Sequence, residues 1–163
     1  CALQFSFPAG YTSSFLISSE LTRDIYPLKQ RKAADDMGWK IELAKRTNFD
    51  YVDEILTHIR ESEEHQSDSL EYAIELENII KEYEHLYEQY PPEVRNRALR
   101  LLYVSKGLQL LNHTIWSPTA ISSLARAVYY DDSKDWELMG SLFASFFGRP
   151  GIKVGRKVRD TLL

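Results

Sequence analysis

The chain has 163 residues, of which 44% are hydrophobic and 27% are charged, and its formal net charge is −4. This composition excludes a wholly disordered chain and predicts a single domain with its own core, spanning residues 1–163. The modest net charge also excludes long-range attraction of the whole chain to nucleic acid.

The only cysteine, Cys1, excludes an internal disulfide and a cysteine-based metal site, and it is typical of a reducing compartment. No apolar run approaches the ~20 residues that a membrane span requires, and no signal segment opens the chain. We therefore expect an intracellular protein, cytoplasmic or nuclear, without a membrane partner. Because the sequence begins with Cys, we expect a processed or excised piece of a longer chain.

A small β-hairpin is predicted over residues 2–17, as an extension (1–18) of a helical domain. Apolar side chains alternate with polar ones in two runs on either side of Pro8-Ala9-Gly10. The alternating apolar positions are Leu3, Phe5, Phe7, Tyr11, Phe15 and Ile17. A lone hairpin is marginal in water, so it requires a third strand or a helix beneath it.

Two short helices are predicted next. Ser18 or Ser19 is expected to cap the first helix, and Pro27 is expected to end or kink it. Residues 38–46 fit two structures, because the apolar spacing up to Ala44 favours a helix whereas the alternation around Trp39 is that of a strand. We expect a helix there.

An antiparallel helical hairpin is predicted from residues 48–63 and 68–90. The second helix carries an apolar stripe with alternating spacings of four and three, formed by Tyr72, Leu76, Ile79, Tyr83, Leu86 and Tyr90. Such a stripe must face another helix, and we interpret it as an interaction surface. The alternative is one continuous long helix that a partner chain covers.

The rest of the chain predicts more helices. Pro92 suits the first position of one that ends near Asn112-His113, and Ser117-Pro118 opens another. Asp131-Asp132 is expected to break that helix and cap the next, which ends at Gly148 and Pro150.

Two features near the chain end remain. The cluster of Phe143, Phe146 and Phe147 is expected in the core, and would be a partner-binding patch if exposed. The basic tail is formed by residues 149–163, and within it residues 151–163 are expected to form a short helix.

Charge is segregated along the sequence. Between Asp53 and Gln89 there are twelve acidic and two basic residues, whereas the tail has five basic residues and one acidic residue. We interpret this either as ordinary solvated helix faces or as surfaces that engage different partners, or each other in a neighbouring copy. The candidate phosphate-binding residues are Arg95, Arg97, Arg100, Arg149, Lys153, Arg156, Lys157 and Arg159.

Tyr129-Tyr130-Asp131-Asp132 has the letters of the Tyr-x-Asp-Asp motif at polymerase metal sites. The polymerase motif occupies a tight turn between strands, whereas here the four residues follow a helical pattern. We therefore favour helix capping by the aspartates.

Arg60 and His65 have the Arg-x4-His spacing that resembles the active-site motif of HEPN ribonucleases, which are also compact helical bundles. The resemblance would make His65 the acid/base and Arg60 the stabiliser of the phosphate oxyanion. The neighbouring glutamates Glu61, Glu63 and Glu64 would repel an RNA backbone. We therefore favour solvated side chains at a helix end.

No glycine-rich phosphate loop and no histidine pattern predicts a cofactor or a metal, so we expect neither, and no catalytic residue. The leading hypothesis is a mainly α, non-enzymatic protein–protein interaction or assembly module that self-associates through helical surfaces. The alternative is a nucleic-acid-binding helical domain that uses the basic residues of 95–106 and 149–159. A HEPN-like ribonuclease is the remote alternative.

Overall fold

The computed structural model describes residues 2–5, 15–26, 29–50, 54 and 69–162, with side chains up to residue 155. In these ranges regular structure is entirely helical, which confirms the expected mainly α fold. The elements are a 3-10 turn η1 (Ala2–Gln4) and the α-helices α1 (Ser19–Ile25), α2 (Asp35–Ala44), α3 (Leu70–Glu82), α4 (Glu84–Tyr87), α5 (Pro92–His113), α6 (Pro118–Tyr129), α7 (Trp136–Ser145) and α8 (Gly148–Leu162).

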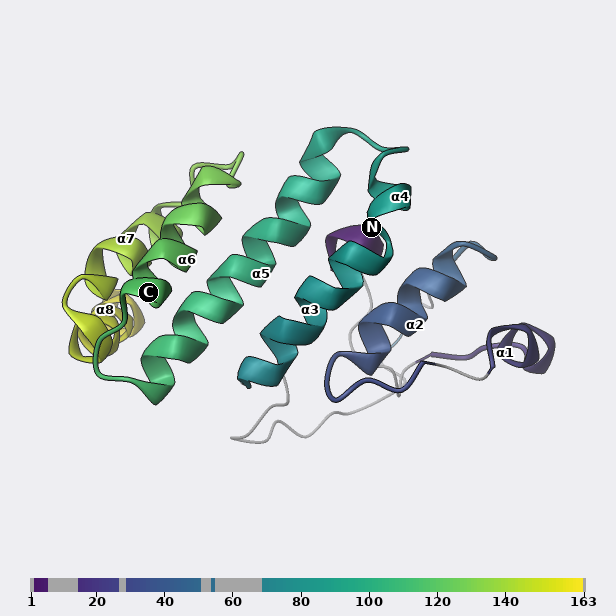
Figure 1. Cartoon of the computed structure of the whole chain (residues 1–163), viewed down its shortest axis with the longest axis horizontal. Helices are drawn as coiled ribbons and strands as arrows, with labels where there is room; N and C mark the ends of the chain where they lie inside the picture. Colours follow the sequence, from purple (N-terminus) through teal and green to yellow (C-terminus); the bar gives the residue numbers. More distant parts are fainter. Residues whose placement is uncertain (1, 6–14, 27–28, 51–53, 55–68, 163) are drawn as a thin grey trace.

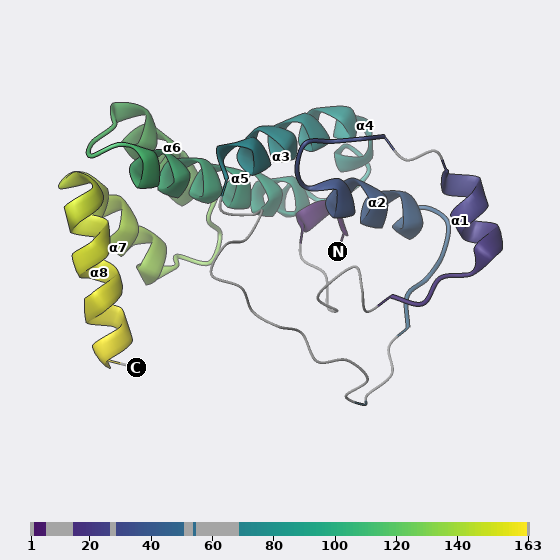
Figure 2. The ribbon, with the colours of Figure 1, turned by 90° about the horizontal axis from the view of Figure 1, so that it is seen from below.

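Helix α5 is the centre of the molecule. Figure 1 shows α3 on one side of it and α6 on the other, with α2 beyond α3 and α1 at the far end. Helices α7 and α8 lie at the opposite end, and in Figure 2 they extend away from the layer formed by α3, α5 and α6. The turn η1 contacts α5 and α2.

The described residues form two hydrophobic clusters. The first joins η1, α2, α3 and α4 to the N-terminal half of α5, with Ile41, Leu76, Ile79 and Leu102 among its buried side chains. The second joins the C-terminal half of α5 to α6, α7 and α8, and its buried residues are Leu111, Ala120, Leu124, Ala127, Leu138 and Ile152. Helix α5 therefore contributes to both clusters.

Three predicted helix starts are confirmed. Ser18 caps α1 by accepting from the Leu21 amide, and Ser117 caps α6 by accepting from the Ala120 amide. Pro92 is the first residue of α5, where its missing N–H costs nothing. Residues 38–44 are helical as expected, within α2.

The strand predicted at the chain start is wrong for the residues described there. Residues 2–4 form the turn η1, and residues 15–18 have no regular structure. The Leu3 carbonyl accepts a hydrogen bond from the Tyr87 hydroxyl (2.6 Å) and Phe5 is in the left-handed region, so a β-ladder does not form here. Residues 6–14, which include the predicted turn, lie outside the described residues.

The helical hairpin also differs from the prediction. Residues 47–50 are not helical, and most of the predicted first helix (48–63) lies outside the described residues. The second helix begins at Leu70 and breaks at Tyr83 between α3 and α4. Among the described helices, α3 packs mainly against α5.

Two boundaries near the C-terminal end were misplaced. The N-cap of α7 is Asp135, whose carboxylate accepts from the amides of Glu137 and Leu138, instead of Asp131-Asp132. Gly148 and Pro150 were expected to end a helix, but α7 ends at Ser145 and they open α8 instead. Proline fits there because a first-turn N–H has no intrahelical partner.

Candidate functional site

The predicted apolar stripe belongs to the core of this chain. Leu76 and Ile79 are fully buried, Tyr83 is 5% exposed, and Tyr72 and Leu86 are partly buried against the first cluster. Of the stripe, only Tyr90 is half exposed. The interpretation of these six residues as an interaction surface is therefore corrected, because α5, η1 and α2 already cover them.

The acidic face of α3 and α4 is largely neutralised within the chain. Glu82 accepts from both Lys29 and Arg31 at 2.8 Å, and Glu84 pairs with the predicted phosphate-binding Arg95 at 2.7 Å. Glu77 pairs with Lys81 and Lys106, at 2.8 and 3.3 Å. The fold thus brings together charges that are segregated in the sequence.

Arg100, another predicted phosphate-binding residue, is held by two carboxylates. Its Nη2 lies 2.5 Å from Asp135 Oδ2 and its Nε lies 3.0 Å from Asp131 Oδ1. Burial of the Asp131 carboxylate raises its pKa, but hydrogen bonds from Ser133 and the Asp135 amide, with the Arg100 charge, leave the pKa below its usual range. The Tyr129–Asp132 motif is therefore a structural turn in which the buried Asp131 carboxylate pairs with the partly exposed Arg100.

The other predicted phosphate-binding residues differ in placement. Arg97, Arg149 and Lys153 are exposed, and among the described residues no ion pair reaches them. Arg156, Lys157 and Arg159 lie in α8, beyond the described side chains. Other exposed cations of the described residues also take part in none of the ion pairs, so unpaired positive charge is spread over the surface; they are Arg23, Lys32, Arg126 and Lys134.

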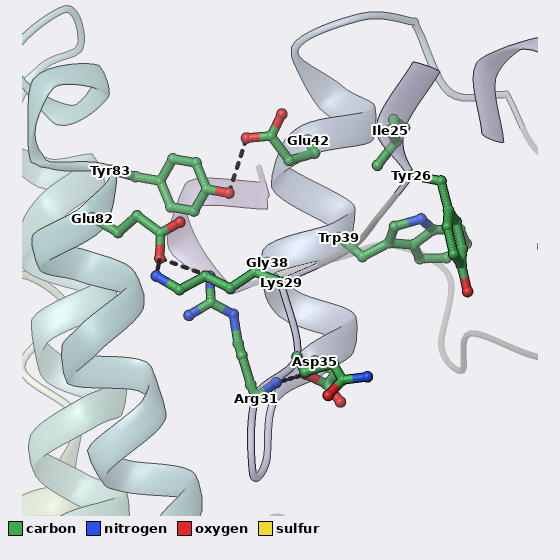
Figure 3. A pocket seen from close by; sticks show the side chains of 11 residues that line it. Ile25, Tyr26, Lys29, Arg31, Asp35, Gly38, Trp39, Glu42, Glu82 and Tyr83 are labelled. Atoms are coloured by element: carbon green, nitrogen blue, oxygen red, sulfur yellow. Dashed lines mark hydrogen bonds and ion pairs between the residues drawn. The ribbon is translucent and has the colours of Figure 1, made fainter. Parts of the chain in front are cut away.

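A charged cleft of about 470 Å³ lies between residues 25–26 and 29–31, α2 and the end of α3 (Figure 3). Lys29 and Arg31 converge on Glu82 inside it, while Tyr26 and Trp39 form its far wall. The Arg31 side chain is 4% exposed, and a Cβ on Gly38 would lie only 2.9 Å from its Nε. The cleft therefore depends on Gly38 to admit the guanidinium.

Two titratable groups of this cleft, Glu42 and Tyr83, have pKa values shifted away from neutral pH. Burial raises the pKa of Glu42, but hydrogen bonds from Arg46, Lys45 and Tyr83 outweigh it and bring the pKa to about 2. Burial and the hydrogen bond to Glu42 raise the pKa of Tyr83 above its ordinary value. Neither group is poised to exchange a proton near pH 7, so this arrangement suits structural ion pairing better than acid–base catalysis.

An exposed aromatic patch occupies the other end of the molecule. We use the name aromatic patch for Ile115, Trp116, Phe143, Phe146 and Phe147, which are 77%, 55%, 68%, 58% and 65% exposed. The rings of Phe143 and Phe147 meet edge to face, with centroids 5.6 Å apart. The expectation that the three phenylalanines lie in the core is therefore wrong.

Two hydrogen bonds hold the parts of the aromatic patch together. The Trp116 indole donates to the Phe146 carbonyl at 3.1 Å, and the Arg149 amide donates to the Ile115 carbonyl at 2.7 Å. Gly148 makes the second contact feasible: its φ is +67°, and a Cβ there would lie 2.2 Å from the Ile115 carbonyl oxygen. The patch is thus fixed by backbone contacts before any partner binds.

A signal in the sequence of α7 could have revealed this patch. Leu138 is buried and Leu142 packs against the second cluster, but Trp136, Met139 and Phe143 lie on other faces and stay exposed. A ten-residue helix at the edge of a bundle can bury only one face. A short helix with large apolar residues on more than one face therefore predicts that some of them stay exposed.

Comparison with known proteins gives no functional information, since no family model, curated protein or solved structure matches the chain. Within the described residues, no cluster of three or more His, Cys, Asp or Glu side chains could hold a metal ion. None of the described helices combines the length and apolar character needed to cross a bilayer. Arg60 and His65 lie outside the described residues.

Proposed function

We propose that the protein is a non-enzymatic interaction or assembly module that binds a protein partner through its aromatic patch. The observation that carries the proposal is the exposure of Phe143, Phe146 and Phe147, each more than half accessible on a patch held by hydrogen bonds. Monomeric proteins rarely leave several large apolar side chains together in water without a use for them.

The energetics of the aromatic patch suit a contact surface. Full burial of one large apolar side chain contributes roughly 1.5–3 kcal/mol. Aromatic anchors also dominate measured binding energies, because they bury a large area at a low cost in conformational entropy. Two or three such anchors, already positioned before binding, support specific recognition of a partner.

Affinity capture from native extracts tests the proposal, using immobilised wild type, Phe143→Ser/Phe147→Ser and the control Tyr129→Ser. Tyr129 is 81% exposed at the end of α6, so its loss removes an exposed aromatic ring outside the patch. We expect specific partners, further copies of the chain included, to fall about tenfold or more with the double variant, since each 1.4 kcal/mol lost is a factor of ten.

The control variant should bind as the wild type does. If the double variant retains the same bound proteins, or if the wild type is monomeric and captures nothing, the proposal is wrong. Thermal melts of all three proteins would show that the fold is intact, because the substituted side chains are exposed.

Nucleic-acid binding is a second candidate, favoured by the exposed cations on α8. Arg149 and Lys153 have the freedom to contact phosphates that Arg95 and Arg100 lack. Binding to single- and double-stranded probes should then weaken with salt, and Arg149→Gln/Lys153→Gln should reduce the slope of log K against log salt by about 1.4–1.8. No binding at low salt would exclude this candidate.

A further inference from the structure

Helix α7 and the turn after it present an exposed seam, which we define as Trp136, Gly140, Phe143 and Phe147. Their spacings of four, three and four residues place them along one face, as at the contact positions of a coiled coil. The three aromatic members are 83%, 68% and 65% exposed, and Gly140 is exposed as well. The seam therefore alternates large side chains with one position that has no side chain.

Space is available at Gly140. A Cβ built there meets no other atom within 4 Å. Beside it lies a groove of about 510 Å³ between α7, α8 and α5, with Ser141, Ala144, Ile152 and Gly155 among its walls. Leu108, Ala144 and Ile152 line the groove with apolar atoms, beside the charged Glu137. A neighbouring aromatic ring would therefore find apolar atoms next to the depression at Gly140.

The order of the seam is self-complementary when reversed. If a second α7 runs antiparallel with the two-fold axis midway between positions 140 and 143, each Phe143 faces the glycine of the other copy. In the same register each Trp136 faces the other copy's Phe147. Phe143 then fills the depression at Gly140, and Trp136 packs on Phe147. The two-fold symmetry repeats both contacts on the other side of the axis, as in any isologous interface.

The register also sets the orientation. In a parallel two-fold pair each seam residue faces its own copy, so Phe143 would meet Phe143 and the two Gly140 positions would face each other. Only the antiparallel pair places a large side chain opposite the depression.

We propose that the chain forms a two-fold symmetric homodimer in which the α7 seams pack antiparallel and Phe143 of each copy enters the depression at Gly140 of the other. This inference rests on the proposed function, because it names a second copy as the partner of the aromatic patch. It differs from membrane insertion, which would use the exposed rings but gives no role to a depression in register with them.

Light scattering over a concentration series tests the dimer with a residue swap. The wild type should rise from the 19.0 kDa monomer toward twice that mass. Gly140→Leu fills the depression and should weaken dimerisation at least tenfold, as should Phe143→Ala, since each removes about 1.4 kcal/mol or more. Combined, Gly140→Leu/Phe143→Ala exchanges the large and small positions and should recover about tenfold or more over Gly140→Leu.

Each other outcome has a defined meaning. A wild type that is monomeric at high micromolar concentration, or a dimer that neither single variant weakens, overturns the seam contact, as does a double variant that shows no recovery. If the wild type is monomeric while Phe143→Ser/Phe147→Ser still loses a captured protein, the dimer is wrong and the proposed function stands. If a monomeric wild type binds anionic phosphatidylserine vesicles through Phe143, the patch faces a membrane and both proposals fall.

Discussion

Around α3, the aromatic side chains are inside and their hydroxyls are satisfied: Tyr83 donates to Glu42 at 2.9 Å and Tyr87 donates to the Leu3 carbonyl at 2.6 Å. Around α6 to α8, the interior is built from smaller residues such as Ala120 and Ala127, and the phenylalanines remain outside. Ion pairs such as Arg31–Glu82 and Arg95–Glu84 lie beside the first cluster, whereas Arg149 and Lys153 near the second cluster are exposed. The first region buries Tyr83 and Tyr87 in its own core, whereas the second region leaves three phenylalanines exposed to solvent.

The largest expected difference between the regions comes from removing one aromatic ring from each. Tyr87→Ala deletes a side chain that is 4% exposed and leaves a cavity, so the free energy of unfolding should fall by about 3–5 kcal/mol. Phe143→Ala deletes a ring that is 68% exposed, and unfolding should change by less than about 1 kcal/mol. Urea denaturation below the dimerisation range measures both.

If both variants lost a similar free energy of unfolding, the difference between the two regions would be disproved, because Phe143 would then support the fold of the isolated chain. Tyr87→Phe separates the ring from its hydroxyl. That variant keeps the packing but leaves the Leu3 carbonyl without its donor, so it should cost about 1 kcal/mol, at the lower end of the cost of a buried unsatisfied group.

Two glycines of the second region differ in how much space surrounds them, and replacing each with alanine tests that difference. A Cβ on Gly107 would lie 2.7 Å from the Leu124 side chain and 3.2 Å from the Ala120 carbonyl oxygen, so Gly107→Ala should destabilise by about 1–3 kcal/mol through overpacking of α5 on α6. Gly140→Ala meets nothing in the monomer and should stabilise by about 0.5–1 kcal/mol, because alanine has the better helix propensity. In thermal melts, Gly107→Ala should lower the melting temperature and Gly140→Ala should raise it. These opposite shifts would show that position 107 is buried and that position 140 is on an open face.

The smallest expected effect is the loss of the Glu42 contribution to stability at low pH. The pKa of Glu42 is about 2 in the fold against an ordinary value of 4.5, so its ionised form stabilises the protein above pH 4.5, and that contribution is lost as the pH falls toward 2. Glu42→Gln should be less stable than the wild type by up to about 1 kcal/mol at pH 7, since these ion pairs are partly solvated. Urea midpoints at several pH values should show the two proteins converging at the acid end.

Local signals in the sequence predicted the parts of the fold that local chemistry decides. Ser18, Pro92 and Ser117 each satisfy or tolerate the free amides of a first helical turn, and each stands where a helix starts. Periodicity also identified which residues of α3 are buried, although it could not show that α5 of the same chain covers them. An apolar stripe indicates that another helix must cover it, but it does not identify that helix.

Features that depend on contacts between residues far apart in the sequence could not be predicted from local patterns. The predicted phosphate-binding residues Arg95 and Arg100 pair with Glu84 and Asp135, which are separated from them by 11 and 35 positions. Leu3 and Phe5 alternate like a strand, but the chain start folds onto Tyr87, 84 residues from Leu3. From the sequence, an exposed phenylalanine cluster was only the alternative to a buried one, because hydrophobicity alone does not say which face of α7 the second cluster has room to cover.

The 22-residue α5 runs through both clusters, and it follows that neither half should melt by itself. Leu102 and Leu111 lie on the same helix, in different clusters. A substitution that removes packing at Leu111 should therefore also destabilise the part of α5 that carries Leu102, and lower the free energy of unfolding of the whole chain. Amide protons in the middle of α5 should therefore be the slowest in the chain to exchange with deuterated solvent, and their rates should report the cooperativity of the whole molecule.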